Sequence, residues 1–251
     1  MRKQVFLFSF LLLSTTSLFS QRSLTSTDMR DYQYKHEASG GVRIQTNGFT
    51  IFGEYGWIKD IKRTRLLQLE YTYFIDYRQK KQKTRLPGGR DYVFGVQNRF
   101  HTIRVAYGFK RVIADKAVRN GVCVSATFFG GVSLGLLKPY YLNLVQPTTD
   151  GSIIVRPERY TSENESRFLS KDSIVDAAPI RYGLNQIQPV AGAHIKAGID
   201  FDWGSKDQFV KALQAGVMLD VYYKRLPLMV NNTNRFYQAA FYLSFQFGKR
   251  W

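Results

Sequence analysis

The chain has 251 residues, of which 44% are hydrophobic and 15% aromatic, enough for one domain of ordinary size. Beyond the N-terminus no apolar run is long enough for a transmembrane helix, which excludes a polytopic helical membrane protein. The single cysteine, Cys123, excludes a disulfide framework and a cysteine-built zinc site. Lysine and arginine number 36 against 19 acidic residues, and this net charge of +17 favours anionic partners.

The N-terminus has the three parts of a secretory signal peptide. Arg2 and Lys3 form a basic start, Val5 to Leu13 form an apolar core, and small polar residues follow. We predict a cleavable signal peptide over residues 1–20 and a polar N-terminal tail over residues 21–38. An exported chain is not expected to meet nucleic acid, so its positive charge points to phospholipid or lipopolysaccharide.

From residue 39 onward, hydrophobic residues alternate with polar or small ones. In residues 67–77 the odd-numbered side chains are Leu, Tyr or Ile, and most even-numbered ones are polar. A period of two is typical of a β-strand whose two faces meet different surroundings. The pattern predicts eight strands, at about 39–46, 49–58, 65–78, 100–111, 121–136, 189–203, 210–224 and 235–250. Several exceed the usual ~5–6 residues and suit a tilted membrane crossing of ~9–11 residues.

The first two predicted strands are joined by Asn47-Gly48. This dipeptide favours the type I′ turn of a tight β-hairpin. With these two residues as the loop, Arg43 lies opposite Phe52 and is a diagonal neighbour of Glu54 on one face.

Two folds share the alternating pattern: a soluble barrel with its apolar face inside, and a membrane barrel with that face against lipid. An eight-stranded interior is too narrow for all the large side chains of the apolar face, among them Tyr71, Phe128, Phe201 and Phe245. The other face combines charged residues with several glycines, which fits a packed polar lumen. The large side chains of one face and the polar, glycine-containing character of the other therefore favour the membrane barrel.

The aromatic residues and the connections support the same choice. If the barrel begins on the periplasmic side, the strands that run back toward it end in Trp57, Trp203 and Trp251, a periplasmic aromatic rim. Connections at that end span roughly 5–10 residues. Two at the opposite end are much longer, about 79–99 and 137–188, as expected of outer loops.

The C-terminus carries a resemblance to a known family. Trp251 is terminal and aromatic, and Phe247, Phe245 and Leu243 precede it in phase, whereas Lys249 departs from the apolar pattern. Together with the signal peptide and eight strands, this ending resembles small OmpA/OmpX-type outer-membrane barrels. The sequence Phe-Gly-Lys-Arg-Trp is similar in style to barrels of Bacteroidota. The resemblance implies the outer membrane of a Gram-negative bacterium.

The predicted fold is all-β. It is an eight-stranded antiparallel transmembrane up-and-down β-barrel over residues 39–251, with one long extracellular loop at about 137–188. Prolines in this loop argue against one long hairpin. Since loops of this length are usually functional or disordered, we expect it to pack over the barrel or contact a partner.

The predicted lumen face carries acids and bases in near balance. Charges buried in so narrow an interior must pair, so we predict a plug of salt bridges, with a conducting path as the alternative. The network consists of Arg43, Glu54, Glu70, Arg104, Lys110, Lys196, Asp200, Asp202 and Asp220.

Two basic clusters flank the predicted membrane band. The first is a basic outer loop with no acid between its ends, and lipid A phosphates are natural counter-charges for it; a solvated mobile loop is the alternative. It consists of Arg78, Lys80, Lys81, Lys83, Arg85 and Arg90. The second lies on the periplasmic side, where anionic phospholipid headgroups lie; it consists of Lys59, Lys62, Arg63 and Arg65.

No residues stand in a recognisable catalytic or metal-binding spacing, so we predict neither an enzyme nor a cofactor. The histidines are His36, His101 and His194, and a catalytic role requires Ser133 or Ser244 to approach His194. We expect a non-catalytic structural or interaction subunit, one candidate being an accessory barrel of a secretion or barrel-assembly complex. A lipid A-modifying enzyme and a small-solute channel are the alternatives.

Overall fold

The computed structural model describes residues 34–60, 62–76, 78–84, 87–116, 121–147, 153–204, 208–230 and 234–251. The predicted signal peptide and most of the predicted tail lie outside the described residues, as does Arg85 of the basic loop. Tyr34–Trp251 form one compact unit.

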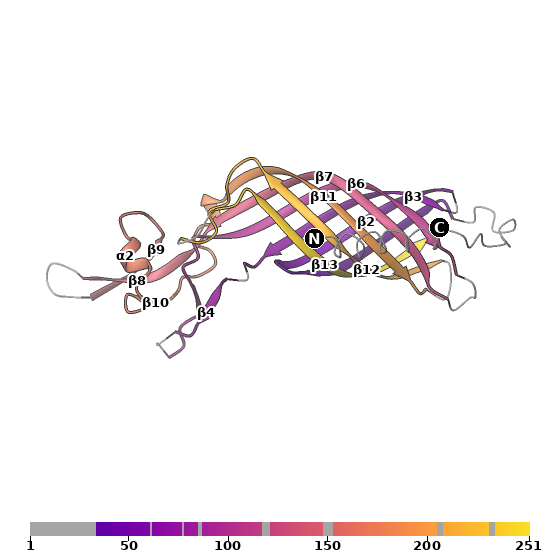
Figure 1. Cartoon of the computed structure of the whole chain (residues 1–251). Coiled ribbons are helices and arrows are strands. Elements are labelled where there is room, and N and C mark those ends of the chain that lie inside the picture. Colours follow the sequence, from indigo (N-terminus) through magenta and orange to yellow (C-terminus); the bar gives the residue numbers. More distant parts are fainter. Residues whose placement is uncertain are drawn as a thin grey trace, which may run out of the picture. The chain divides into compact units, whose positions relative to one another are not determined.

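Eight long strands form a closed antiparallel barrel, in which each strand pairs with its neighbours along the chain and the last pairs with the first (Figure 1). They are β1 (His36–Gln45), β2 (Gly48–Asp60), β3 (Arg63–Phe74), β6 (Asn98–Ala114), β7 (Cys123–Pro139), β11 (Gln188–Asp202), β12 (Phe209–Tyr222) and β13 (Tyr237–Arg250). The predicted all-β, up-and-down barrel of eight strands is thus confirmed.

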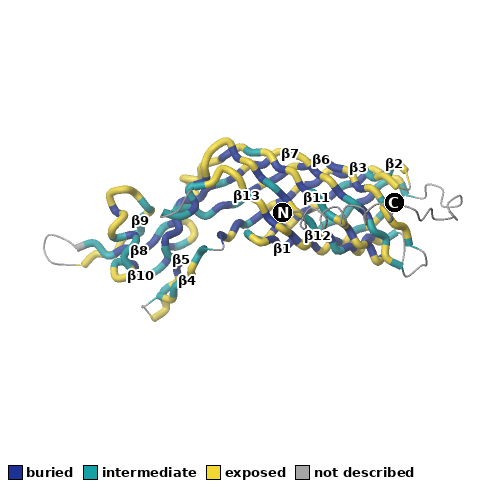
Figure 2. Tube along the Cα trace, viewed as in Figure 1, coloured by how far each residue is buried: buried dark blue, intermediate teal, exposed yellow. Residues whose placement is uncertain are grey.

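The exterior of the barrel is apolar and its interior is polar. Leu69 is 59% exposed, whereas its neighbour Glu70 is 1% exposed, and the same contrast recurs around the wall (Figure 2). Phe128 and Phe245 point outward, while Lys196 is buried inside. An exterior this apolar is stable only against lipid. The barrel therefore spans a membrane.

The first hairpin differs from the predicted register. Gln45 pairs with Gly48 and Arg43 pairs with Thr50, so the loop is Thr46-Asn47. Gly48 belongs to β2, where a Cβ would lie 2.2 Å from the carbonyl oxygen of Tyr73. Gly48 also has a φ of +151°, which other residues rarely adopt, so both the close approach to β3 and the backbone conformation after the turn require glycine. Both pairing schemes keep the same faces inside.

Connections at one end of the barrel build two further small sheets. A three-stranded sheet has the order β10-β8-β9, and a two-stranded sheet pairs β4 with β5. Their elements are β4 (Lys80–Gln82), β5 (Tyr92–Phe94), β8 (Tyr141–Pro147), β9 (Ile153–Arg159), α2 (Glu165–Phe168), β10 (Ile174–Ala177) and η2 (Leu184–Gln186). No helix among the described residues is long and apolar enough to cross a membrane.

The three-stranded sheet, β8–β9–β10, has an apolar core of its own. Leu142, Leu144 and Phe168 are fully buried in it, together with Ile174 of β10 and Tyr92 of β5. The described residues of the long predicted loop are therefore folded, and a short hairpin, β8–β9, forms only one part of them. We call this end of the barrel, with β4, β8, β9 and β10, the loop end (Figure 1). The opposite end, where the backbones of His36 and Trp251 are hydrogen-bonded to each other, is the terminal end.

Replacing Leu69 by Arg tests which surface meets lipid. A charge on the lipid face near the middle of a barrel strand is expected to lower the free energy of unfolding by about 2–4 kcal/mol. The control Ile180→Arg changes a more exposed side chain in the long connection. It is expected to change the free energy of unfolding by less than ~0.5 kcal/mol. Urea unfolding in phospholipid vesicles measures both; equal effects would contradict the orientation of the wall.

Candidate functional site

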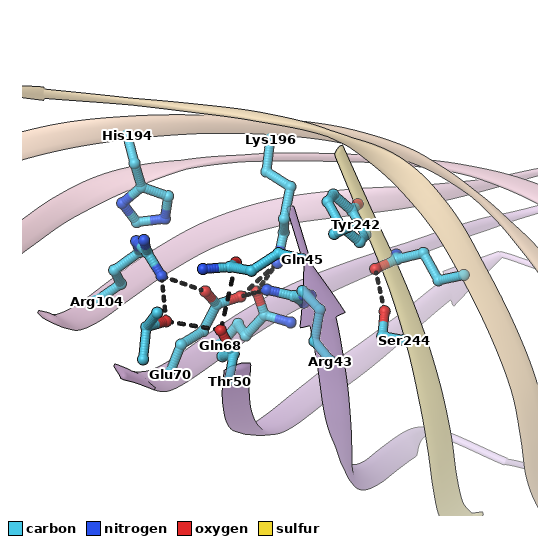
Figure 3. Close-up of polar contacts among 12 residues, drawn as sticks. Arg43, Gln45, Thr50, Gln68, Glu70, Arg104, His194, Lys196, Tyr242 and Ser244 are labelled. Carbon is cyan, nitrogen blue, oxygen red and sulfur yellow. Dashed lines mark hydrogen bonds and ion pairs between the residues drawn. The ribbon is translucent and has the colours of Figure 1, made fainter. Parts of the chain in front are cut away.

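One carboxylate holds three cations at the centre of the lumen (Figure 3). Glu70 accepts hydrogen bonds from Arg43 at 2.6 Å, from Lys196 at 2.5 Å and from Arg104 at 3.4 Å. Arg104 also donates to both carboxylate oxygens of Asp220, at 2.7 and 2.8 Å. All five side chains are buried. Strands β1, β3, β6, β11 and β12 are thus cross-linked through the interior.

Aromatic rings complete this central network. The guanidinium of Arg43 lies 4.7 Å from the ring centres of both Phe52 and Tyr242, and the ammonium of Lys196 lies 4.3 Å from that of Phe129. Such contacts stabilise a cation that has lost its water. The alternating pattern did not indicate these aromatic residues inside the barrel. The signal in the sequence that could have indicated them is the small residues at the positions that they face.

Gly216 illustrates that signal. It lies on β12, and a Cβ there would come within 2.6 Å of the Tyr242 hydroxyl oxygen and 2.2 Å of the Ala197 carbonyl oxygen. Any larger residue would therefore displace the tyrosine ring from the lumen.

A second ionic group fills the lumen near the terminal end. Glu37 accepts from Lys110 at 2.8 Å and from Arg250 at 2.7 Å, and Arg250 also donates to Asp202 at 3.0 Å. The prediction that the barrel begins at residue 39 differs from the structure, since β1 begins at His36. Burial of Glu37 against two cations explains why the strand starts earlier.

Amides and hydroxyls occupy the lumen between the two ionic groups. Glu54 accepts from Gln246 at 2.7 Å and also from Gln68. Glu54 and Arg43 are not the diagonal neighbours that the predicted register made them, because the observed register moves them apart, and Arg43 reaches Glu70. Asp200 is buried opposite Gln214.

Ser133 and His194 do come together, but in an arrangement unlike a catalytic triad. The Ser133 hydroxyl oxygen lies 3.0 Å from His194 Nδ1 and 3.1 Å from an oxygen of Asp220. In a triad the acid holds the histidine and the histidine holds the serine; here the serine is in the middle. His194 Nε2 is buried and no partner is described for it.

The other two histidines each contact a tyrosine. His101 Nδ1 lies 2.7 Å from the Tyr71 hydroxyl, and His36 Nδ1 lies 3.1 Å from that of Tyr55. Across the described ranges, no group of three or more His, Cys, Asp or Glu side chains is placed to hold a metal ion.

The basic outer loop is anchored and partly neutralised. Acids just outside its ends pair with it: Asp76 accepts from Arg78 at 2.5 Å, and Asp91 lies 3.3 Å from Lys81. The Thr84 hydroxyl donates to the carbonyl oxygen of Val175, a residue of β10, at 2.9 Å. Lys80, Lys83 and Arg90 are exposed. The segment therefore covers the β10 edge of the three-stranded sheet.

Trp57, Trp203 and Trp251 lie at the terminal end, each partly exposed. Tyr55 packs against two of them, with its ring centre 5.0 Å from that of Trp57 and 6.3 Å from that of Trp251. The backbone N–H of His36 donates to the Trp251 carbonyl oxygen at 2.9 Å, which ties the two ends of the barrel chain together.

Strand register gathers further exposed bases at this end. Arg63 pairs with Arg111, and Lys249 pairs with Phe209, beside Lys211. The sequence had indicated only the cluster of the β2–β3 turn. The exposed basic residues on outward positions are Arg63, Arg65, Arg111, Lys211 and Lys249.

At the far side of the three-stranded sheet, β9 has a free edge among the described strands. Val145 donates its N–H toward the β10 side, to Ser173 at 2.9 Å, so Val155 opposite it turns its own N–H and carbonyl outward. Pro157, two residues on, has no N–H to offer. Ile153, Ile154 and Val155 are exposed; we call these three residues the β9 tip.

No family model matches the chain, and no curated protein does. Among solved structures it is similar to the attachment invasion locus protein Ail of Yersinia pestis, with 8% identity, 87% of this chain and 99% of that chain covered, and a TM-score of 0.40. It is also similar to Neisserial surface protein A, with 10% identity, 86% of this chain and 96% of that chain covered, and a TM-score of 0.41. A third similar structure is the N-terminal β-barrel domain of Pseudomonas aeruginosa OprF, with 10% identity, 86% of this chain and 96% of that chain covered, and a TM-score of 0.36. The architecture assigned here rests on the chain's own strand pairing and burial.

Replacing Glu70 by Ala is expected to cost about 3–5 kcal/mol of unfolding free energy, because three buried cations lose their shared carboxylate. The matched control is Glu163→Ala, which removes an exposed carboxylate and should change stability by less than ~0.5 kcal/mol. Urea unfolding of both variants in the same vesicles gives the comparison. A Glu70 variant as stable as the control would show that the network is dispensable.

Proposed function

We propose that the chain is a non-catalytic outer-membrane β-barrel that presents a folded sheet to another protein. The observation that carries this proposal is the three-stranded sheet at the loop end, which has its own buried apolar core. A loop needed only to connect two strands would not bury Leu142, Leu144 and Phe168 at the entropic cost of ordering so many residues.

The orientation follows from the connections. We infer that the loop end faces the exterior and that the terminal end, with its tryptophans and exposed bases, lies in the periplasmic leaflet. Short turns inside and long loops outside are the rule in such barrels. Indole rings and basic side chains suit the boundary where anionic headgroups begin.

The filled lumen argues against a small-solute channel. Ion pairs centred on Glu70 and Glu37 occupy two levels, with hydrogen-bonded amides between them. Ions passing through would have to displace buried charge pairs, which costs several kcal/mol for each charge left alone. The position of the serine between acid and histidine likewise disfavours a lipid A-modifying enzyme.

We propose the β9 tip as the main contact. Ile153 is 71% exposed and Val155 is 48% exposed. Arg156 and Arg159 follow on the same strand, so a partner with apolar side chains flanked by acids fits best. An accessory role in a secretion or barrel-assembly complex is one such setting. Contact of the exposed lysines of the basic outer loop with lipopolysaccharide stays a prediction.

Planar-bilayer recordings test the filled lumen. The purified protein is expected to insert without producing ion-current steps, because ion pairs and hydrogen-bonded amides occupy the narrow lumen at successive levels. Reproducible ohmic steps from the wild-type protein would contradict this and favour the channel hypothesis.

Extraction from the native membrane in mild detergent tests the interaction role. A partner chain is expected to co-purify with the wild-type protein, and Ile153→Lys/Val155→Lys is expected to reduce its amount at least tenfold, since two buried apolar contacts are lost. Ile180→Lys, an equally exposed site elsewhere in the long connection, serves as the control. A strictly monomeric wild-type protein, or equal loss with the control, would overturn the proposal.

A further inference from the structure

The barrel wall has a notch at the loop end, above the β1–β2 hairpin. This hairpin turns at Thr46-Asn47, and the pairing of β1 with β13 ends there, with Gln45 opposite Tyr242 and the Thr46 N–H donating to Phe241. β13 begins five residues before Tyr242, at Tyr237. Its first residues therefore extend beyond β1 along the seam where the barrel closes.

The edge of β13 in this notch has backbone groups that no described strand pairs with. The carbonyl of Phe236 points toward β12, where it accepts from Tyr222 at 2.7 Å, and that of Phe241 points the other way, toward β1. Because the direction alternates along a strand, Tyr237 and Ala239 also turn their N–H and carbonyl groups toward the β1 side. No described strand pairs with them there.

A cavity of about 340 Å³ lies against this edge. Its volume is at the lower end of the ~300–1,000 Å³ range of ligand pockets, which suits a segment of a few residues. Phe74, Leu226 and Leu228 line it, and all three are buried in the apolar cluster at the barrel mouth. The cavity thus offers an apolar surface opposite a strand edge.

The remaining wall carries a net positive charge. Asp76 accepts hydrogen bonds from the backbone N–H of Arg78 at 3.0 Å and from its guanidinium at 2.7 and 2.5 Å. Burial raises the pKa of Asp76, but the hydrogen bonds and charge of Arg78, together with the charge of Arg235, outweigh it and lower that pKa below its usual value. The carboxylate is therefore charged and neutralises Arg78. Arg235, an exposed side chain of the same wall, adds one further positive charge.

We propose that this notch binds an extended peptide segment that pairs with the β13 edge, buries an apolar side chain against Leu226 and Leu228, and sets a carboxylate beside Arg235. The backbone edge calls for an amide chain, because a sugar has no alternating N–H and carbonyl groups to pair with it. The apolar wall calls for an apolar side chain in this peptide, and the single excess positive charge calls for one carboxylate. This site is separate from the proposed β9 tip.

Three labelled peptides distinguish the parts of this proposal: acetyl-Val-Leu-Val-Leu with a free carboxylate, its C-terminal amide, and acetyl-Val-Leu-Val-Glu amide. Fluorescence anisotropy with the full barrel in detergent measures their affinity. Both carboxylates are expected to bind at least tenfold more tightly than the neutral amide. The tighter of the two identifies the source as a chain terminus or an acidic side chain. Equal binding of all three would overturn the proposal.

Backbone pairing is tested by a fourth peptide, in which the amide nitrogens are methylated, and by Ala239→Pro, which removes an N–H from the free edge of β13 without touching its bonds to β12. Each is expected to lower affinity tenfold or more. Undiminished binding of the methylated peptide would overturn the strand-pairing mode.

The charge is tested by Arg235→Gln, with Arg225→Gln as the matched control on the same connection. Arg225 is exposed and does not line the cavity. Only the Arg235 variant is expected to lose affinity, about tenfold for the carboxylate peptides and less than twofold for the amide. Competition by glucuronate as strong as that by the peptide, or equal loss in both variants, would overturn the proposal. Unchanged binding in Ile153→Lys/Val155→Lys separates this site from the β9 tip.

Discussion

A strand in lipid has no water to satisfy its backbone, so the sheet must close on itself. Closure of β1 onto β13 is the constraint on which the rest of this molecule depends. Because only eight strands form the closed ring, its interior is narrow and the apolar side chains stay outside. Nine positions of β1 pair with β13 at the closure. Every feature of the loop end is built on the rigid rim that results.

The interior that closure creates is stabilised by electrostatics in a small space. Glu70 can hold Arg43, Lys196 and Arg104 because each of the three comes from a different strand of the ring. A lone charge there would cost more than the barrel can compensate, but charges that share partners and hydrogen-bond to amides are satisfied together. The lumen is therefore better described as a polar core than as a passage.

The period of two in the sequence was sufficient to predict the strands, their order and the face that meets lipid, because a lipid exterior imposes one simple rule on every second residue. Single-residue detail could not be predicted this way. Asn47-Gly48 satisfies the turn rule, yet the close approach of Gly48 to Tyr73 decides the register. That contact joins β2 to β3, and the residues around Asn47-Gly48 in the sequence carry no information about it.

The candidate sites show the same division. The buried charges could be named from alternation alone, whereas their partners depend on register around the whole ring, as Arg43 and Glu54 illustrate. Glu37 was hidden because it precedes the alternating region. The core of the three-stranded sheet joins Tyr92 to Phe168 across two separate connections, and the notch depends on one hairpin being shorter than its neighbour. Neither arrangement leaves a periodic signal in the sequence.

The seam has a consequence for how the molecule assembles. Gly41 meets Gln246 across it, so the contact joins segments from nearly opposite ends of the chain, whereas most other strand pairs form between sequence neighbours. Pairings of such long range carry the largest loop-closure entropy and form late in folding. Hairpins can therefore accumulate first as a curved open sheet, and the rate at which its two edges find each other sets the time a newly made chain spends vulnerable to misassembly.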